Sequence, residues 1–156
     1  MRIFLIRHAH AIDEGARLGD EQRYLTDKGR QVARAVGRAL RAQGVVVDAV
    51  LTSPLVRAVQ TAELIAQALE HAGAVEVLSS LAPGVPSRVV AADLGTRAGA
   101  VALVGHEPNM SALGAMLVGR PGFPPFKKAQ VMLVEDGRAV WSLDPETLAV
   151  NAIRTG

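Results

Sequence analysis

An arginine and a histidine stand at the end of the first apolar stretch of the chain, where their side chains could do chemistry. Residues 2–6 read Arg-Ile-Phe-Leu-Ile and are followed by Arg7 and His8. A short run of large apolar residues predicts a buried strand, which would deliver both side chains to its C-terminal end. In open α/β sheets, ligands bind at that edge. Taken alone, the pair also fits an arginine and a histidine that merely end a strand.

Two later junctions carry residues of the same kind. Ser53 follows a second predicted strand, with Arg57 one helical turn later, and His106 follows another predicted strand. If these strands are parallel, all of these side chains project from one edge of the sheet. Two arginines, two histidines and a helix N-terminus form a cluster with no necessary carboxylate inside, and a phosphoryl group neutralises such a cluster best. We therefore predict a phosphate pocket in which His8 attacks phosphorus.

The elements that must position these residues alternate between strands and helices. Thr26 is a predicted helix N-cap, Gly44 a stop signal, and Ser53 with Pro54 a helix start. This alternation predicts an α/β fold: a single-domain three-layer sandwich over residues 1–156, with a mostly parallel central sheet and an antiparallel edge hairpin. Besides the opening strand, we expect strands at 45–52, 75–78, 100–104, 129–135 and 138–143, helices at 27–43, 54–72, 87–98 and 108–117, and an active-site loop at 11–25.

Composition restricts the class of protein. A length of 156 residues is typical of one domain, and a hydrophobic content of 49% excludes a disordered tail. The net charge of +2 is too small and too scattered for a nucleic-acid partner. The absence of cysteine excludes disulfides, thiolate metal sites and cysteine nucleophiles. The N-terminal apolar run is too short for a signal peptide or a membrane span, so we expect a cytoplasmic protein. Separately, we expect a monomer.

Three segments together resemble one family. The chain is similar to the histidine phosphatase superfamily in three segments. They are the Arg7-His8 start, residues 53–62 (Ser-Pro-Leu-Val-Arg-Ala-Val-Gln-Thr-Ala) and residues 104–109 (Val-Gly-His-Glu-Pro-Asn). Residues 25–29 and 31–33 match its usual entry to the first helix. Within the superfamily, the chain resembles the compact SixA-type phosphohistidine phosphatases. The matching motifs run from residue 1 to about 118, in the right order and at the right spacing, which makes the signal far stronger than any one motif.

The resemblance implies a role for each matching residue. His8 would be the nucleophile and form a phosphohistidine intermediate, Arg7 and Arg57 would hold the phosphoryl oxygens, and His106 would donate to an oxygen in the transition state. Phosphoryl transfer depends mainly on positioning and charge neutralisation, which fits such a set. A neutral imidazole attacks well when its other nitrogen is held as a donor, so we expect one His8 nitrogen to bond a backbone carbonyl. We expect no metal and no cofactor, because the arginines supply the charge.

One departure from the family pattern bears on the substrate. Many members that cleave sugar phosphates have a glutamate after the third strand as general acid, whereas residues 78–83 here read Leu-Ser-Ser-Leu-Ala-Pro. An alkoxide leaving group needs a proton, while phosphohistidine releases a far better leaving group. The missing acid therefore favours phosphohistidine on a protein, either a histidine phosphotransfer domain or a phosphocarrier. Alternatively, Glu107, His10, Asp13 or Glu14 could supply the proton.

Other interpretations stay open from the residues alone. His10, Arg23 and Glu107 are candidate substrate-binding residues, although His10 and Arg23 could be solvated loop residues. A small-molecule phosphomonoesterase and a non-catalytic phosphoprotein-binding module are the alternative functions. The pair His8-x-His10 resembles two metal ligands, but no third ligand is near in sequence, so we expect no metal site.

Overall fold

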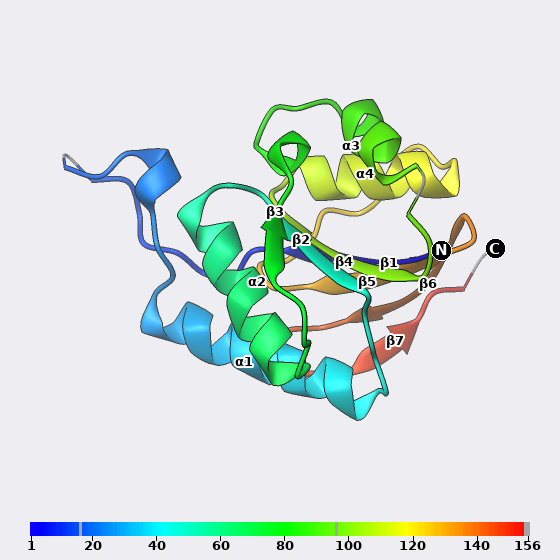
Figure 1. The fold of residues 1–156 in the computed structure, drawn as a ribbon, viewed down its shortest axis with the longest axis horizontal. Coiled ribbons are helices and arrows are strands. Elements are labelled where there is room, and N and C mark those ends of the chain that lie inside the picture. The colour runs from blue at the N-terminus through cyan, green and yellow to red at the C-terminus, as the bar shows by residue number, and fades with distance from the viewer. Residues whose placement is uncertain (16, 96, 155–156) are drawn as a thin grey trace.

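The computed structural model describes residues 1–15, 17–95 and 97–154, and shows one mixed β-sheet between two layers of helices (Figure 1). The sheet has the strand order β3-β2-β4-β1-β5-β6-β7, in which β3, β2, β4 and β1 are parallel to one another and β5, β6 and β7 pair antiparallel. The strands are β1 (Arg2–Arg7), β2 (Ala49–Thr52), β3 (Val75–Val77), β4 (Ala100–Gly105), β5 (Val131–Glu135), β6 (Arg138–Leu143) and β7 (Val150–Ala152). The helices are α1 (Asp27–Ala42), α2 (Val56–Ala68), α3 (Ser87–Leu94) and α4 (Asn109–Val118), with 3₁₀ turns η1 (Asp20–Gln22) and η2 (Ser79–Leu81).

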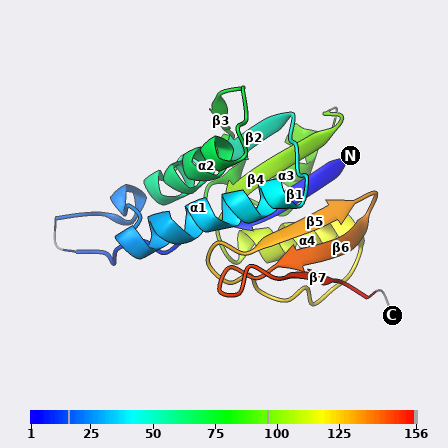
Figure 2. The ribbon, with the colours of Figure 1, turned by 90° about the horizontal axis from the view of Figure 1, so that it is seen from below.

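The two helical layers lie on opposite faces of the sheet. Helices α1 and α2 cover one face, and α3 and α4 cover the other (Figures 1 and 2). Successive side chains of strand β1 point to opposite faces of the sheet, so the strand packs against both helical layers. Phe4 and Ile6 pack in the core under α1 and α2, whereas Ile3 and Leu5 pack in the core under α3 and α4. The predicted three-layer α/β fold is confirmed.

Helix α1 begins and ends where the sequence predicts. The side chain of Thr26 accepts a hydrogen bond from Gly29 N at 3.0 Å and so caps the helix. Gly44 has a φ of +75°, which glycine adopts without strain, and it follows the C-cap Gln43.

The start predicted for α2, with Ser53 as the cap and Pro54 as the first helical residue, was wrong by two residues. The helix begins at Val56, and Ser53 instead forms a turn before it by accepting a hydrogen bond from Leu55 N at 3.2 Å. The start of β2 also lies later than the predicted residue 45, because Val45 N bonds Leu40 O and so extends the end of α1.

The C-terminal part of the sheet contains one strand more than predicted. The hairpin of β5 and β6 turns at Asp136 and Gly137, both with positive φ, as the sequence indicates. The missed strand β7 pairs antiparallel with β6. Helix α3 ends at Leu94, short of the predicted residue 98. Across the described ranges, no helix combines the length and apolar character needed to span a membrane.

Candidate active site

The three predicted junctions lie side by side in the sheet. Strands β1, β4 and β2 are neighbours, and His8, His106 and Ser53 follow their C-terminal ends. The pairing continues one residue past the strands, since His8 N donates to Gly105 O at 3.0 Å and Ser53 N donates to Val104 O at 2.9 Å. These backbone bonds fix the directions in which the side chains leave the sheet. The expected convergence at one edge is therefore present.

A cavity of about 310 Å³ opens at this edge. Of the predicted site residues, all but His10 line it. Asp20, Pro83 and Lys128 complete the wall. The lining residues are Arg7, His8, Asp20, Arg23, Arg57, Pro83, His106, Glu107 and Lys128.

His8 is held as a neutral imidazole whose Nε2 lone pair accepts only a long hydrogen bond. Its Nδ1 lies 2.7 Å from the carbonyl oxygen of Ala9, and because a carbonyl only accepts, Nδ1 carries the proton. The lone pair is then on Nε2, toward which Arg57 Nε–H donates at 3.4 Å. Burial, followed by the nearby His106 and arginines, lowers the pKa of His8 to about 3. The expected bond from one His8 nitrogen to a backbone carbonyl is confirmed.

His106 faces His8 with a ring-to-ring distance of 5.1 Å. Burial is the main cause that lowers the pKa of His106 to about 4, and Arg57 and Arg7 add to it while Asp20 opposes it. Both rings are therefore neutral near pH 7. A neutral imidazole next to the nucleophile can donate a hydrogen bond without adding a full charge.

The two arginines are held by backbone carbonyls. Arg7 Nη1 donates to Phe126 O at 2.8 Å, and its backbone N–H donates to Gln130 O at 3.2 Å. Burial lowers the pKa of Arg7, and Glu107 acts in the opposite direction. Arg57 is almost fully buried, and its Nη1 donates to Asp20 O at 2.7 Å. These contacts orient both guanidinium groups before any ligand arrives.

A carboxylate lies among these cations, although the predicted cluster did not require one. Asp20 Oδ2 is 3.2 Å from Arg57 Nη2, and Asp20 Oδ1 is 2.9 Å from Arg23 Nη1. The bond to Arg23 is the largest cause of the lowered pKa of Asp20, and Arg57 contributes as well. Asp20 comes from η1 in the 11–25 loop, of which residue 16 lies outside the described residues. Asp20 thus partly neutralises the charge of the arginines at the site.

Thr61 is a further residue at the site that sequence reasoning missed. Its buried hydroxyl accepts from Ala9 N at 3.0 Å and donates to Arg57 O at 2.8 Å. It thereby joins the end of β1 to α2. A threonine on the apolar face of a helix is the sequence signal that could have indicated such a role.

His10 does not lie with the other predicted residues. Its Nδ1 bonds Thr26 Oγ1 at 2.8 Å, beside the start of α1, and it does not line the cavity. The prediction that His10 binds substrate therefore has no support from its position. Arg23 lines the cavity, but its Nε is bonded to Ile12 O at 2.6 Å.

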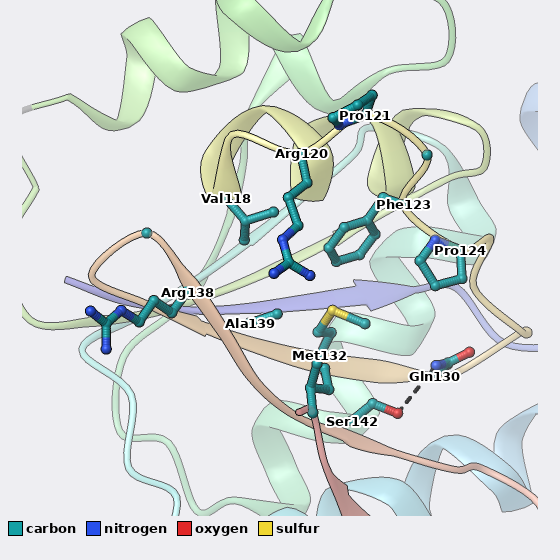
Figure 3. Close-up of a pocket in the computed structure, with 13 residues that line it drawn as sticks. Val118, Arg120, Pro121, Phe123, Pro124, Gln130, Met132, Arg138, Ala139 and Ser142 are labelled. Carbon is teal, nitrogen blue, oxygen red and sulfur yellow. Dashed lines mark hydrogen bonds between the residues drawn. The ribbon is translucent and has the colours of Figure 1, made fainter. Parts of the chain in front are cut away.

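A larger cavity, of about 500 Å³, lies elsewhere, lined by residues that include Arg120, Phe123 and Met132 (Figure 3). It is bounded by the segment after α4 and by β5 and β6, and Phe123 and Met132 form part of its apolar lining. No histidine and no carboxylate line it. Its size alone does not make it a reaction site, because it lacks a nucleophile for phosphoryl transfer. Nowhere in the described ranges do three or more His, Asp or Glu gather as a metal site would require.

Comparison with known proteins identifies the class of protein that this fold and site define. A model of the histidine phosphatase superfamily (branch 1) matches residues 3–82, just over half of the chain. Phosphohistidine phosphatase SixA of Escherichia coli strain K12 is 31% identical over 154 residues, which cover 93% of this chain and 94% of that protein. The chain therefore belongs to the histidine phosphatase superfamily, and its similarity to SixA makes it a phosphatase, which is a hydrolase.

Within the superfamily, the similarity is to SixA, as the motifs indicated. A solved structure of the protein histidine phosphatase SixA complexed with tungstate superposes with a TM-score of 0.88 at 29% identity, covering 96% of this chain and 100% of that chain. A mycobacterial glucosyl-3-phosphoglycerate phosphatase superposes with a TM-score of 0.66 at 19% identity, over 97% of this chain and 96% of that chain. The second likeness concerns the fold alone, so the substrate must be argued from the site.

Proposed function

We propose that this chain is a metal-independent phosphatase that hydrolyses phosphohistidine on a protein partner through a phospho-His8 intermediate. The observation that carries the proposal is the state of His8, whose Nδ1 is bonded to a carbonyl and whose Nε2 keeps its lone pair. The same cavity is lined by Arg7, Arg57 and His106. The two guanidinium groups bind the phosphoryl oxygens with their positive charge. The neutral imidazole of His8 then attacks the phosphorus atom that they hold in place.

The reaction balances with the residues present. The Nε2 lone pair of His8 forms a new N–P bond while the P–N bond of the substrate breaks and its electron pair stays on the leaving imidazole. The reacting form of the substrate is the one whose far ring nitrogen is protonated, so the leaving imidazole departs neutral. Water then attacks phospho-His8, both of its protons remain on the phosphate formed, and the N–P electron pair returns to Nε2. Arg7, Arg57 and His106 hold the oxygens in both steps.

The positions of the candidate acids support phosphohistidine over a phosphate monoester. Glu107 accepts hydrogen bonds at both carboxylate oxygens, from Ser111 N and from Ser111 Oγ, each at 2.8 Å. His10 does not line the cavity. An alkoxide leaving group would need a proton donor next to the scissile bond, whereas the imidazole of phosphohistidine does not.

We further propose that the partner is a phosphorylated signalling or phosphocarrier protein, met by a cytoplasmic monomer. The name of the Escherichia coli relative, phosphohistidine phosphatase, supports a phosphohistidine substrate. A histidine phosphotransfer domain or a phosphocarrier protein would present its phosphoimidazole on a protein surface. Lys128 and Arg23 line the same cavity and would meet the charge of such a surface.

A substrate panel tests this function. Wild-type protein should hydrolyse a phosphohistidine protein with a higher kcat/KM than p-nitrophenyl phosphate or a sugar phosphate, and an acid-labile phosphoenzyme should accumulate on rapid quenching. His8→Ala should abolish hydrolysis and the trapped phosphoenzyme while still binding inorganic phosphate, because the arginines remain.

The matched control is His71→Ala, since His71 lies away from the cavity and should leave all rates unchanged. Full activity of His8→Ala would show that the nucleophile is wrongly assigned. An equal or higher kcat/KM on the sugar phosphate would favour the phosphomonoesterase. Phosphate binding without turnover of any phosphorylated compound would favour the binding module.

A further inference from the structure

A fully buried hydroxyl group joins the second histidine to the turn before α2. Ser53 Oγ lies 2.7 Å from His106 Nε2 and accepts a hydrogen bond from Leu55 N at 3.2 Å. Ser53 is 0% exposed and His106 is 3% exposed, so bulk water does not serve either group. The other ring nitrogen of His106, Nδ1, is buried with no hydrogen-bond partner in the described part of the chain.

The count of donors and acceptors decides which nitrogen of His106 carries the proton. A serine hydroxyl has one O–H to donate and lone pairs that accept. Leu55 N–H already uses a lone pair of Ser53, so the O–H needs an acceptor, and the lone pair of His106 Nε2 is the one within reach. If His106 Nε2 donated instead, the serine O–H and the Nδ1 lone pair would both be buried without partners, whereas the Nδ1–H tautomer leaves only the Nδ1–H group without one, so the count favours the Nδ1–H tautomer. The lowered pKa of His106, about 4, agrees with a neutral ring that has a defined tautomer.

We propose that Ser53 is a positioning residue that holds His106 as the Nδ1–H tautomer, so that the unpartnered Nδ1–H is kept for a phosphoryl oxygen of the substrate. This inference rests on the proposed function for its purpose, though not for the tautomer itself. With the opposite tautomer, a lone pair on Nδ1 would face an anionic oxygen and repel it. His8 and His106 would then be matched neutral imidazoles, each with its tautomer set by a different bond.

Nitrogen NMR of the resting protein tests the tautomer directly. The chain has four histidines, so the His106 signals can be assigned by their loss in His106→Gln. In the wild-type protein at neutral pH, Nε2 should show the chemical shift of a nitrogen with a lone pair, and Nδ1 that of a protonated nitrogen. A protonated Nε2 would overturn the proposal, whether or not the protein hydrolyses phosphohistidine. Conversely, a phosphatase with no activity on phosphohistidine but with this tautomer would contradict the proposed function alone.

Kinetics separate positioning from a merely structural role. Ser53→Ala should lower kcat on a phosphohistidine protein about tenfold, the effect of losing one oriented hydrogen bond, with little change in KM. Its NMR spectrum should show the second tautomer of His106. Ser53→Thr keeps the hydroxyl and should restore the wild-type tautomer and most of kcat.

The matched control is Ser80→Ala, because Ser80 is another buried serine and its Oγ has no partner in the described part of the chain. This control should change neither kcat nor the His106 signals. A Ser53→Ala protein with an unchanged His106 tautomer and unchanged kcat would overturn the proposal. Thermal unfolding of each variant reports whether it is folded, and the wild-type spectrum decides the tautomer even if Ser53→Ala fails to fold.

Discussion

Removing the negative charge of Asp20 should strengthen the binding of phosphate. Asp20 Oδ2 lies 3.2 Å from Arg57 Nη2, and the backbone oxygen of Asp20 accepts from Arg57 Nη1 at 2.7 Å. A phosphoryl group that binds Arg57 must share or displace the carboxylate contact, and its own charge is repelled by Asp20. Asp20→Asn keeps the shape and the backbone contact and removes only the charge. We therefore expect tighter binding of inorganic phosphate to this variant.

The size of the effect follows from the exposure of the pair. The side chain of Asp20 is 42% exposed, while that of Arg57 is 6% exposed. Ion pairs with an exposed partner contribute about 0–1 kcal/mol, because solvent screens them. A change of up to about 1 kcal/mol corresponds to an affinity increase of up to about fivefold.

The measurement is the dissociation constant of inorganic phosphate by calorimetry, together with its inhibition constant in the hydrolysis assay. Glu21→Gln is the matched control, because Glu21 is an exposed neighbour in the same turn and does not line the cavity. If long-range charge alone mattered, both variants would respond equally. Weaker phosphate binding by Asp20→Asn would refute the reasoning, since it would mean that the carboxylate chiefly orients Arg57.

Three further outcomes test the structure. Folding lowers the pKa values of His8 and His106 from 6.5 to about 3 and about 4, so between about pH 6.5 and 3 the unfolded chain binds more protons than the folded chain. The free energy of unfolding, measured with urea, should therefore fall as the pH is lowered from about 6.5 to about 3. The fall should be less steep in His8→Gln, which lacks one of the two groups. Thr61→Val should lower the free energy of unfolding by about 1–3 kcal/mol, since it leaves a buried amide at the end of β1 without an acceptor; an unchanged urea midpoint would contradict this. Gly29→Ala places a methyl group against the backbone carbonyl of His10 and should lower the free energy of unfolding by about 1–3 kcal/mol, measured by thermal unfolding. An unchanged free energy of unfolding would show that α1 can shift to make room for the methyl group.

The part of the site that follows from topology could be predicted from the sequence. Apolar runs precede each junction that carries a site residue: Arg7 with His8, Arg57, and His106. Parallel strands bring the C-terminal ends of these runs to one edge of the sheet, independently of the conformation of the loops. The α/β class and the cap at Thr26 depend on equally local signals. These predictions needed only periodicity and the order of the elements.

The part that depends on loop conformation could not be predicted. Asp20 and Arg57 are 37 positions apart, and the 11–25 loop has no apolar period that would fix where Asp20 points. His10 is two residues beyond His8, but the strand has ended there, so the alternation that would place both on one side no longer applies. Strand β7 has three residues, too few for a pattern to indicate a strand.

The strand order has a consequence for how the protein is made. Strands β1 and β2 are not paired with each other, and β4, which is synthesised some fifty residues after β2, lies between them. A nascent chain that has emerged from the ribosome only as far as β3 therefore contains His8 and Arg57 but has no sheet that joins them. Insertion of β4 completes the sheet there and brings His106 at the same moment. The proposed site can therefore be complete only after β4 has joined β1 and β2.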